Sequence, residues 1–418
     1  MRSILLIVRR SLRTHALSTA LTVLSAGLAS GLVMSVFNVS QQTTNAFTGG
    51  EIGYDAVLGA KGSPLQLVLN TVFHLESSPG NIPWAMYQEW RDKPGVRYAI
   101  PYAVGDNYYG HRVVGTTEDI FDQFEYQKDR PFEFARGRKF DEGYREAVIG
   151  ASVARKRGLA LNDKFQVFHG LDYSPVLSQL HPEVYSVVGV LEPTNTPADE
   201  VIWIPIEGIF RMSGHLLADG TEATELGGGE IPDEQKEVSS VMIKFTSPAV
   251  GMGRYANTIT AINRGDAATI AYPIAQVMLG FLSKMGWITK VLVYIAYLVV
   301  GVASFGLLAS IYNTMNERRR EFAVLRALGA RRSTVFTAIV CEAATIAFLG
   351  ALLGYALYAI VMFVTAYFVR EETGVHLDTL AYHPSLVWAP VAMVALGALA
   401  GIVPARKAYA TDVARTLS

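Results

Sequence analysis

The stretch NERRREFAVLRALGARRS, residues 316–333, carries six arginines and lies between two of the most apolar runs of the chain. Three kinds of segment have such a composition: a patch that binds nucleic acid, a positively charged anchor beside a membrane, or a helix on which a partner docks. The choice among them depends on the flanking apolar runs and on the charge of the rest of the chain.

The composition is that of a membrane protein. Half of the 418 residues are hydrophobic and only 17% are charged, which is too apolar for an average soluble enzyme. The formal net charge of −1 provides no positive field, so nucleic acid is not expected as a partner. Cys341 is the only cysteine, which excludes an intrachain disulfide and a CxxC motif.

Four apolar segments are long enough to cross a bilayer, which takes about 20 residues. They cover residues 16–37, 288–312, 335–369 and 386–405. The third is longer than one crossing, so its outer end is expected to continue as helix beyond the lipid. The first is longer than a signal-peptide core and has no clear cleavage site after it, so an uncleaved anchor is expected.

Charge asymmetry predicts the orientation of these spans, because Lys and Arg concentrate on the cytoplasmic side. Residues 1–15 hold four basic residues and no acid, and residues 313–334 hold six arginines against two acids, Glu317 and Glu321. The tail, residues 406–418, holds three basic residues and one acid, whereas residues 370–385 hold one arginine and three acids. Both termini are therefore expected in the cytoplasm, with a short outer loop between the third and fourth spans.

The long segment between the first two spans, residues 38–284, is then expected outside, with 21 basic and 30 acidic residues. Its patterns are mixed: a short helix is predicted over 83–93, and strands over 96–104, 184–193 and 200–210. The fold class predicted is a membrane α-helical protein with four transmembrane helices and a large α+β domain inserted between helices 1 and 2.

No catalytic, cofactor-binding or metal-binding residue is predicted. The chain has no HExxH, GxSxG or closely spaced His/Cys motif. His111, His169 and His181 are expected to be surface or loop residues rather than ligands. No G-x4-G-K-[ST] phosphate loop occurs, so an ATPase that powers this protein is expected to be another chain.

Paired small residues at a spacing of four occur in three of the spans. Such pairs let helix backbones approach closely in lipid. Two arrangements have this signature: packing among the chain's own helices, and oligomerisation through one of the faces. The residues are Gly27, Gly31, Gly350, Gly354, Gly397 and Gly401.

Glu342 is an ionisable residue about two turns into the third span. Such residues usually face the interior of a helix bundle and serve a function. Hydrogen bonding near the lipid headgroups is the alternative.

Within the arginine stretch, Phe322, Leu325 and Leu328 recur at i, i+3 and i+6, which predicts one apolar stripe on a short helix. Gly329 is suited to end that helix. Arg326 lies off the stripe, so the segment is an amphipathic helix rather than a uniformly basic loop.

The run RRREFAVLRALGARRSTVFTAIVCEAA, residues 318–344, resembles the core of the MacB/FtsX-type permeases of ABC transporters. That family has the pattern E-[FI]-x-x-[LM]-[RK]-A-[LI]-G-A, followed by a membrane helix with an early Glu and glycines. Residues 145–165 and 185–205 are similar to the periplasmic domain of MacB-like proteins, and residues 401–417 resemble the family's ending. The positions that match the core motif are Glu321, Phe322, Leu325, Arg326, Ala327, Leu328, Gly329, Ala330, Glu342, Gly350 and Gly354.

The resemblance implies a non-catalytic permease subunit in a bacterial inner membrane, working as a homo- or heterodimer. Cytoplasmic ATPase subunits would bind ATP and Mg²⁺ and dock on residues 313–334, the coupling segment. Their closure would be transmitted to the periplasmic domain for export or extraction of a substrate, with a periplasmic adaptor or binding protein as a further partner. That domain would combine a porter-like part from both flanks with an inserted part over residues 118–237.

Stand-alone MacB-like or LolC/LolE-like subunits fit best, because MacB carries its own ATPase and FtsX has a smaller external domain. A second class of function is a regulator that transports nothing and whose periplasmic domain controls a periplasmic enzyme. The large, subdivided external domain favours the transporter.

Overall fold

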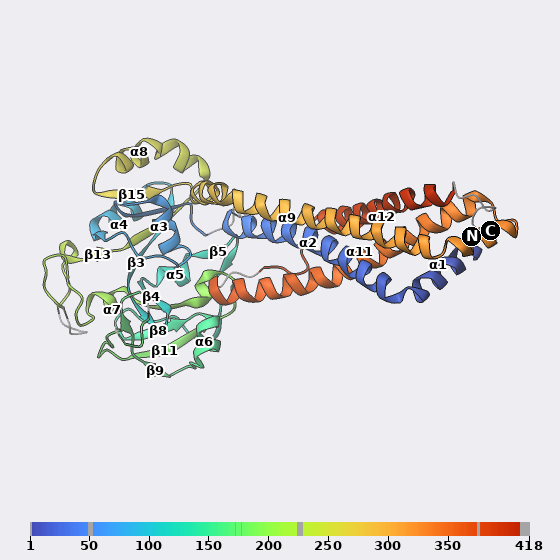
Figure 1. The fold of residues 1–418 in the computed structure, drawn as a ribbon. Coiled ribbons are helices and arrows are strands. Elements are labelled where there is room, and N and C mark those ends of the chain that lie inside the picture. The colour runs from blue at the N-terminus through green and yellow to red at the C-terminus, as the bar shows by residue number, and fades with distance from the viewer. Residues whose placement is uncertain are drawn as a thin grey trace. The chain divides into compact units, whose positions relative to one another are not determined.

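A computed structural model describes residues 2–48, 53–171, 173–176, 178–223, 229–373 and 377–409. The chain divides into two compact units (Figure 1). The helical unit comprises Met1–Thr43, Lys284–Phe368 and Leu377–Ser418. The other unit, Thr44–Ser283 with Val369–His376, is called the extramembrane domain here. Most of the predicted cytoplasmic tail lies outside the described residues.

Among the described residues, four helices are long and apolar enough to span a membrane, as the sequence predicted. Two of them are much longer than a crossing: α9 has 44 residues and α11 has 42, or about 60 Å or more each at 1.5 Å per residue. Helix α9 begins at Ile274, before the predicted start of the second span at residue 288, and continues through Lys284 and Lys290. The helices that enter the helical unit are α1 (Arg2–Thr14), α2 (Ala16–Thr48), α9 (Ile274–Glu317), α10 (Arg319–Ala327), α11 (Arg332–Thr373) and α12 (Ser385–Tyr409).

Helices α2 and α11 approach each other through glycine. A Cβ atom added at Gly31 would lie 2.8 Å from the carbonyl oxygen of Gly354, and one added at Gly350 would lie 2.5 Å from the Cβ of Ala26. One added at Gly27 would lie 3.1 Å from the carbonyl oxygen of Gly350. Contacts this short require a hydrogen atom in place of a side chain on each helix.

Helix α12 packs against α11 through the third glycine pair, Gly397 and Gly401. A Cβ at Gly397 would lie 2.3 Å from the Cβ of Ala347, and one at Gly401 would lie 2.7 Å from the Cβ of Ala343. All six glycines singled out in the sequence therefore face the chain's own helices. Of the two arrangements that the sequence left open, the structure has packing within the chain.

The glycine contacts make a testable prediction. Gly31→Ala should lower the free energy of unfolding by about 1–3 kcal/mol, because the added methyl group meets backbone that cannot rotate away. The matched control is Gly306→Ala in α9, where an added Cβ meets no atom within 4 Å among the described residues. That change should be neutral or stabilising by up to about 1 kcal/mol. Denaturant unfolding followed by helical circular dichroism measures both, and equal effects would contradict the packing.

The extramembrane domain is built on an 11-stranded sheet with the order β15-β1-β14-β3-β4-β12-β8-β11-β7, to which β9 and β10 add at β11 and β3. Its strands are β1 (Ala56–Ala60), β3 (Val96–Tyr108), β4 (His111–Thr116), β7 (Phe134–Gly137), β8 (Glu146–Ile149), β9 (Lys164–Phe165), β10 (Phe168–His169), β11 (Tyr185–Leu191), β12 (Val201–Pro205), β14 (Ser240–Phe245) and β15 (Ala268–Ala271). Two short pairs complete the strands: β2 (Ile82–Pro83) with β13 (Glu237–Val238), and β5 (Glu125–Gln127) with β6 (Arg130–Pro131). The helices and helical turns are α3 (Pro64–Thr71), α4 (Trp84–Arg91), α5 (Asp119–Asp122), α6 (Ala151–Arg157), η1 (Pro197–Glu200), α7 (Ile206–Phe210), η2 (Asp233–Gln235), η3 (Val250–Arg254) and α8 (Ala256–Arg264).

The long strand β3 joins the two halves of this sheet. Its first half pairs with β14 and its second half with β4. Strands β1, β14 and β15, which come from the two ends of the domain, lie together on one side of β3. Most strands of the predicted inserted part belong to this same sheet, which continues from β3 through β4 and β12, whereas β5 and β6 form a separate pair. Residues 224–228 of that part lie outside the described residues.

Both faces of the sheet are buried. Val57 and Trp203 enter one apolar cluster, whereas their neighbours Leu58 and Ile204 enter the other. Strands covered on both faces have apolar residues in succession instead of alternation. This explains why such runs were recognisable in the sequence as strands.

The short predicted elements are mostly confirmed. The helix predicted over 83–93 is α4, and the strands over 96–104 and 184–193 are β3 and β11. The strand predicted over 200–210 is wrong in its second half, because β12 ends at Pro205 and α7 follows. An apolar run of this length does not distinguish a strand from a buried helix by its period alone.

Candidate functional site

Helix α10 ends in a well-defined stop. Gly329 adopts a φ of +97°, in the left-handed region that glycine tolerates best. Its N–H donates to the carbonyl of Arg326 (3.1 Å), and the N–H of Ala330 donates to the carbonyl of Leu325 (3.0 Å). These two bonds define a Schellman motif, which confirms the helix end predicted at Gly329.

The predicted apolar stripe does not face one way. Phe322 is only 7% exposed and packs in a cluster of the helical unit with Val335 and Ile339. Leu325 packs partly against the same cluster, whereas Leu328 is 81% exposed. The expectation that all three form a free ridge is therefore wrong for Phe322. Spacing showed that these residues share a helix face but not that part of this face packs against the chain itself.

The exposed apolar surface of this segment is made by Val324 and Leu328. Val324 is 44% exposed and lies four residues before Leu328, so the two side chains are neighbours on one side of the segment. Glu321, whose side chain is 67% exposed, lies in the first turn of α10. The segment thus presents an apolar pair with charged residues near it.

An ion pair connects this segment to two other helices. Arg318 stands between α9 and α10, and its Nη1 lies 3.4 Å from Oε2 of Glu342 in α11 and 2.6 Å from Oγ of Ser11 in α1. The Ser11 hydroxyl also donates to Oε1 of Glu342. The Arg318 guanidinium lies 5.0 Å from the ring centre of Phe322.

Glu342 is thus a partner of Arg318 in the interior of the helical unit, with 8% of its surface exposed. The sequence singled out Glu342 but not Ser11 or Arg318. Arg318 was hidden among six arginines that all fit a positive anchor. The pair holds the junction between α9 and α10 against α11, while Arg318 also pairs with Glu321 of α10 at 3.2 Å.

The pair can be tested with Glu342→Gln, which keeps an acceptor for Ser11 but removes the charge opposite Arg318. Breaking a buried pair costs about 3–5 kcal/mol, and we expect a loss at the lower end because both side chains keep 11% exposure. Glu317→Gln is the control, since Glu317 is 64% exposed and lies 3.3 Å from His15. It should cost no more than about 1 kcal/mol. Thermal unfolding in detergent gives both values, and equal losses would contradict the role of the pair.

A second group of polar residues converges inside the extramembrane domain. One oxygen of Asp106, Oδ1, lies 3.0 Å from Nε2 of His181, 3.2 Å from Nε2 of His215 and 3.5 Å from Nδ1 of His169. The Asp106 side chain is fully buried. We call these four residues the histidine–aspartate cluster.

The fold positions each member of the cluster by a different element. Asp106 follows a β-bulge in β3, where Gly105 is the extra residue: Val104 pairs with Val114 and Asp106 pairs with Val113. Bulges of this kind turn a side chain to a new direction. His169 ends β10, His181 follows a bridge at Leu180, and His215 lies in the turn after α7.

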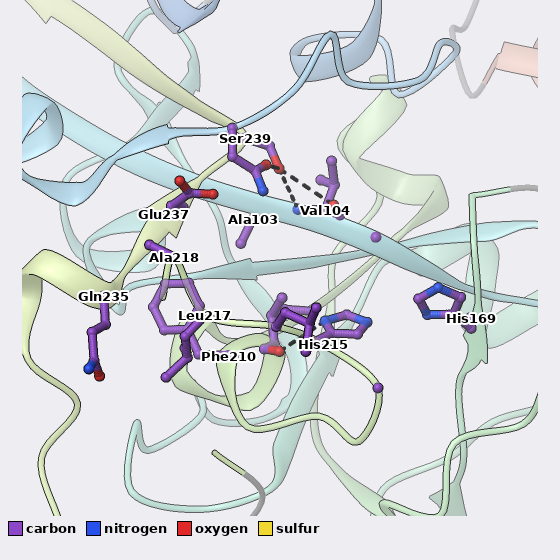
Figure 2. Close-up of a pocket in the computed structure, with 15 residues that line it drawn as sticks. Ala103, Val104, His169, Phe210, His215, Leu217, Ala218, Gln235, Glu237 and Ser239 are labelled. Carbon is purple, nitrogen blue, oxygen red and sulfur yellow. Dashed lines mark hydrogen bonds between the residues drawn. The ribbon is translucent and has the colours of Figure 1, made fainter. Parts of the chain in front are cut away.

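The cluster opens onto a cavity of about 270 Å³ that is lined by His169 and His215 (Figure 2). His169 has half of its side chain exposed, whereas His181 and Asp106 are buried behind it. Burial opposes ionisation of Asp106, but hydrogen bonds from the three histidines outweigh this and hold the pKa of its carboxyl below the usual range. The same contact with Asp106 raises the pKa of His169.

The sequence analysis missed this cluster. The expectation that these histidines are surface or loop residues is wrong for His111, which lies in β4 and is 6% exposed. His181 lies in a loop, as expected, but is equally buried. His111 pairs with Glu200 (3.0 Å), and His181 belongs to the cluster. The four members are separated along the chain by 63, 12 and 34 residues, so no motif search over short spacings finds them.

Two family models match the chain. Residues 19–261 match the MacB-like periplasmic core domain, and residues 293–413 match the FtsX-like permease C-terminal family. The fold and these matches define a permease of an ABC transporter. The chain belongs to the MacB/FtsX-type permeases, as the resemblance implied.

Individual relatives are distant. The macrolide export ATP-binding/permease protein MacB of Bdellovibrio bacteriovorus is 23% identical over 218 residues, which is 50% of this chain and 30% of that protein. The probable syringafactin export ATP-binding/permease protein SyfD of Pseudomonas syringae pv. syringae is 25% identical over 237 residues, 56% of this chain and 33% of that protein. The matched part thus spans about a third of the length of these relatives.

A solved structure of the periplasmic region of MacB from Actinobacillus actinomycetemcomitans aligns with 10% identity and a TM-score of 0.36, covering 58% of this chain and 98% of that one. The family matches and the four spans confirm the predicted fold class: membrane helices with an α+β periplasmic domain between the first and second. The chain is a membrane protein of the bacterial inner membrane.

Proposed function

We propose that this chain is the permease subunit of an ATP-driven transporter of the mechanotransmission type. In this mechanism a cytoplasmic ATPase moves the periplasmic domain from inside, and the substrate is exported or extracted at the periplasmic face. The proposal places both termini and α10 in the cytoplasm, in agreement with the positive charge of these segments. The proposal assigns ATP and Mg²⁺ to a separate ATPase subunit that docks on this chain.

The observation that carries the proposal is the exposed apolar pair on the α10 segment. Val324 and Leu328 are 44% and 81% exposed, beside several arginines and just after a membrane-spanning helix. Paired apolar side chains surrounded by charge are suited to a protein partner, because their burial is favourable and the charges set the orientation. We therefore assign the ATPase contact to Val324 and Leu328, with Phe322 and Leu325 holding the segment in place.

One continuous helix, α9, would carry movement from the ATPase contact to the periplasmic domain. Helix α9 runs unbroken from Ile274, just after β15, to Glu317, and the Arg318–Glu342 pair links its end to α11. Movement of α10 by a closing ATPase would therefore displace two helices that are each longer than the membrane is thick.

We further propose a second permease copy and a periplasmic adaptor or binding protein as partners. The six glycines discussed above are occupied by the chain's own helices, so a second copy would use another surface. Helix α9 is the least covered span, with 17% of its most apolar window buried against 50% for α2.

Leu328→Asp tests the docking assignment. A carboxylate in place of this leucine should reduce recovery of the ABC ATPase with the tagged, full-length chain at least tenfold, while membrane insertion is unchanged, since Leu328 packs little against its own chain. Leu380→Asp is the matched control. Leu380 is 90% exposed in the segment between α11 and α12, which the proposed topology places on the other side of the membrane.

Recovery of the ATPase at the wild-type level with Leu328→Asp would overturn the docking assignment. The purified complex also distinguishes the two proposed functions, transporter and regulator. A transporter's ATP hydrolysis should rise when its cargo is added, whereas a regulator should bring down a periplasmic hydrolase whose activity changes with ATP hydrolysis.

A further inference from the structure

We infer that Asp106, His169, His181 and His215 bind a divalent transition-metal ion of the zinc class in the periplasmic domain. Three imidazole nitrogens converge on a single carboxylate oxygen, and one atom from each of the four side chains lies within 4.8 Å of the others. Imidazole and carboxylate are the ligand types that Zn²⁺ takes in proteins.

The hydrogen bonding of His215 is the first argument for a cation. Its Nδ1 lies 3.1 Å from the carbonyl oxygen of Ile209, and a carbonyl oxygen can only accept, so Nδ1 carries the proton. In the neutral ring Nε2 then has a lone pair, and this lone pair faces the Asp106 oxygen at 3.2 Å. This contact is favourable only if a cation lies between the two atoms or if Nε2 also carries a proton, which makes the ring an imidazolium. Metal-binding histidines regularly donate their other ring N–H to a backbone carbonyl in this way.

The geometry of the rings is the second argument. The three imidazole centroids form an equilateral triangle with sides of 5.3 Å. Nitrogens bound to zinc at about 2.0–2.1 Å in tetrahedral directions place their ring centres about 5 Å apart and their ligand atoms about 3.3 Å apart. The Asp106 oxygen lies 3.0–3.5 Å from the three nitrogens, which matches those edges. The ligand nitrogens lie within 4.8 Å of one another.

The second oxygen of Asp106 is the third argument. Oδ2 is buried and has no hydrogen-bond partner among the described residues. A buried carboxylate with an unpaired oxygen is costly, and a dication bound to the other oxygen offsets that cost.

The surroundings favour entry of an ion and its retention. His169 and His215 line the cavity, so an ion can arrive from that side and be held against Asp106 and His181. Gly105 leaves room for His215, because a Cβ at this position would lie 3.3 Å from Cε1 of the imidazole. Four protein ligands fill a tetrahedral shell and leave no position for water, so the site would hold a metal rather than catalyse hydrolysis.

The test uses the full-length chain in detergent, stripped of metal, with Zn²⁺ titrated against a chromogenic chelator. We expect one high-affinity Zn²⁺ per chain and at least tenfold weaker binding in His181→Gln and in His215→Gln. The matched control is His111→Gln, which removes an equally buried histidine that pairs with Glu200 outside the cluster and should bind Zn²⁺ as the wild type does.

Two further measurements keep the test decisive if a variant fails to fold. Co²⁺ bound to the unaltered chain should give the strong visible absorption of a four-coordinate site. Gly105→Ala retains all four ligands but crowds His215, so it should weaken Zn²⁺ binding while circular dichroism stays unchanged. Absence of high-affinity Zn²⁺ in the wild type, or equal affinity in wild type and the His181→Gln/His215→Gln double variant, would overturn the inference. Neither result depends on whether an ATPase docks at Leu328.

Discussion

The helical unit depends on the close approach of other helices to α11. Lipid offers no hydrophobic gain for joining apolar helices, so association relies on contact between backbones and on polar pairs. Helix α11 has both: Gly350 and Gly354 meet α2, Ala343 and Ala347 receive α12, and Glu342 pairs at the end of α9. Ala343, Ala347, Gly350 and Gly354 recur at i, i+4, i+7 and i+11, so they form one stripe of small residues on α11. The first half of this stripe meets α12 and the second half meets α2.

The membrane part was predictable because length and charge suffice to define it. A span must be long and apolar, and its flanks must carry charge of the right sign, so hydropathy and arginine counts identified all four helices. What the sequence could not supply was which face of α10 is free. Phe322 and Leu328 have the same character and lie on one face by their spacing, yet only the folded helical unit decides that one is buried and the other exposed.

The histidine–aspartate cluster, in contrast, could not be predicted from the sequence. Its members come from a strand, the end of a short strand, a bridge and a turn, and nothing local distinguishes His181 from His111. Only the pairing of β10 with β3 sets His169 opposite Asp106. A motif search does not find such a site, because its residues are distant in the sequence and only the register of the sheet brings them together. A site on a single helix, such as the coupling segment, is recognisable because its residues recur at helical spacing.

The bulge at Gly105 has a consequence for how this domain tolerates insertions and deletions. Strand β14 pairs with β3 up to Tyr102, and β4 pairs with β3 on both sides of the bulge. The extra residue therefore decides which face of the sheet receives Asp106. Loss of one residue here would turn the carboxylate away from the histidines and leave every strand in place. The loops that carry His181 and His215 can vary in length, but β3 must keep its residue count for the cluster to persist.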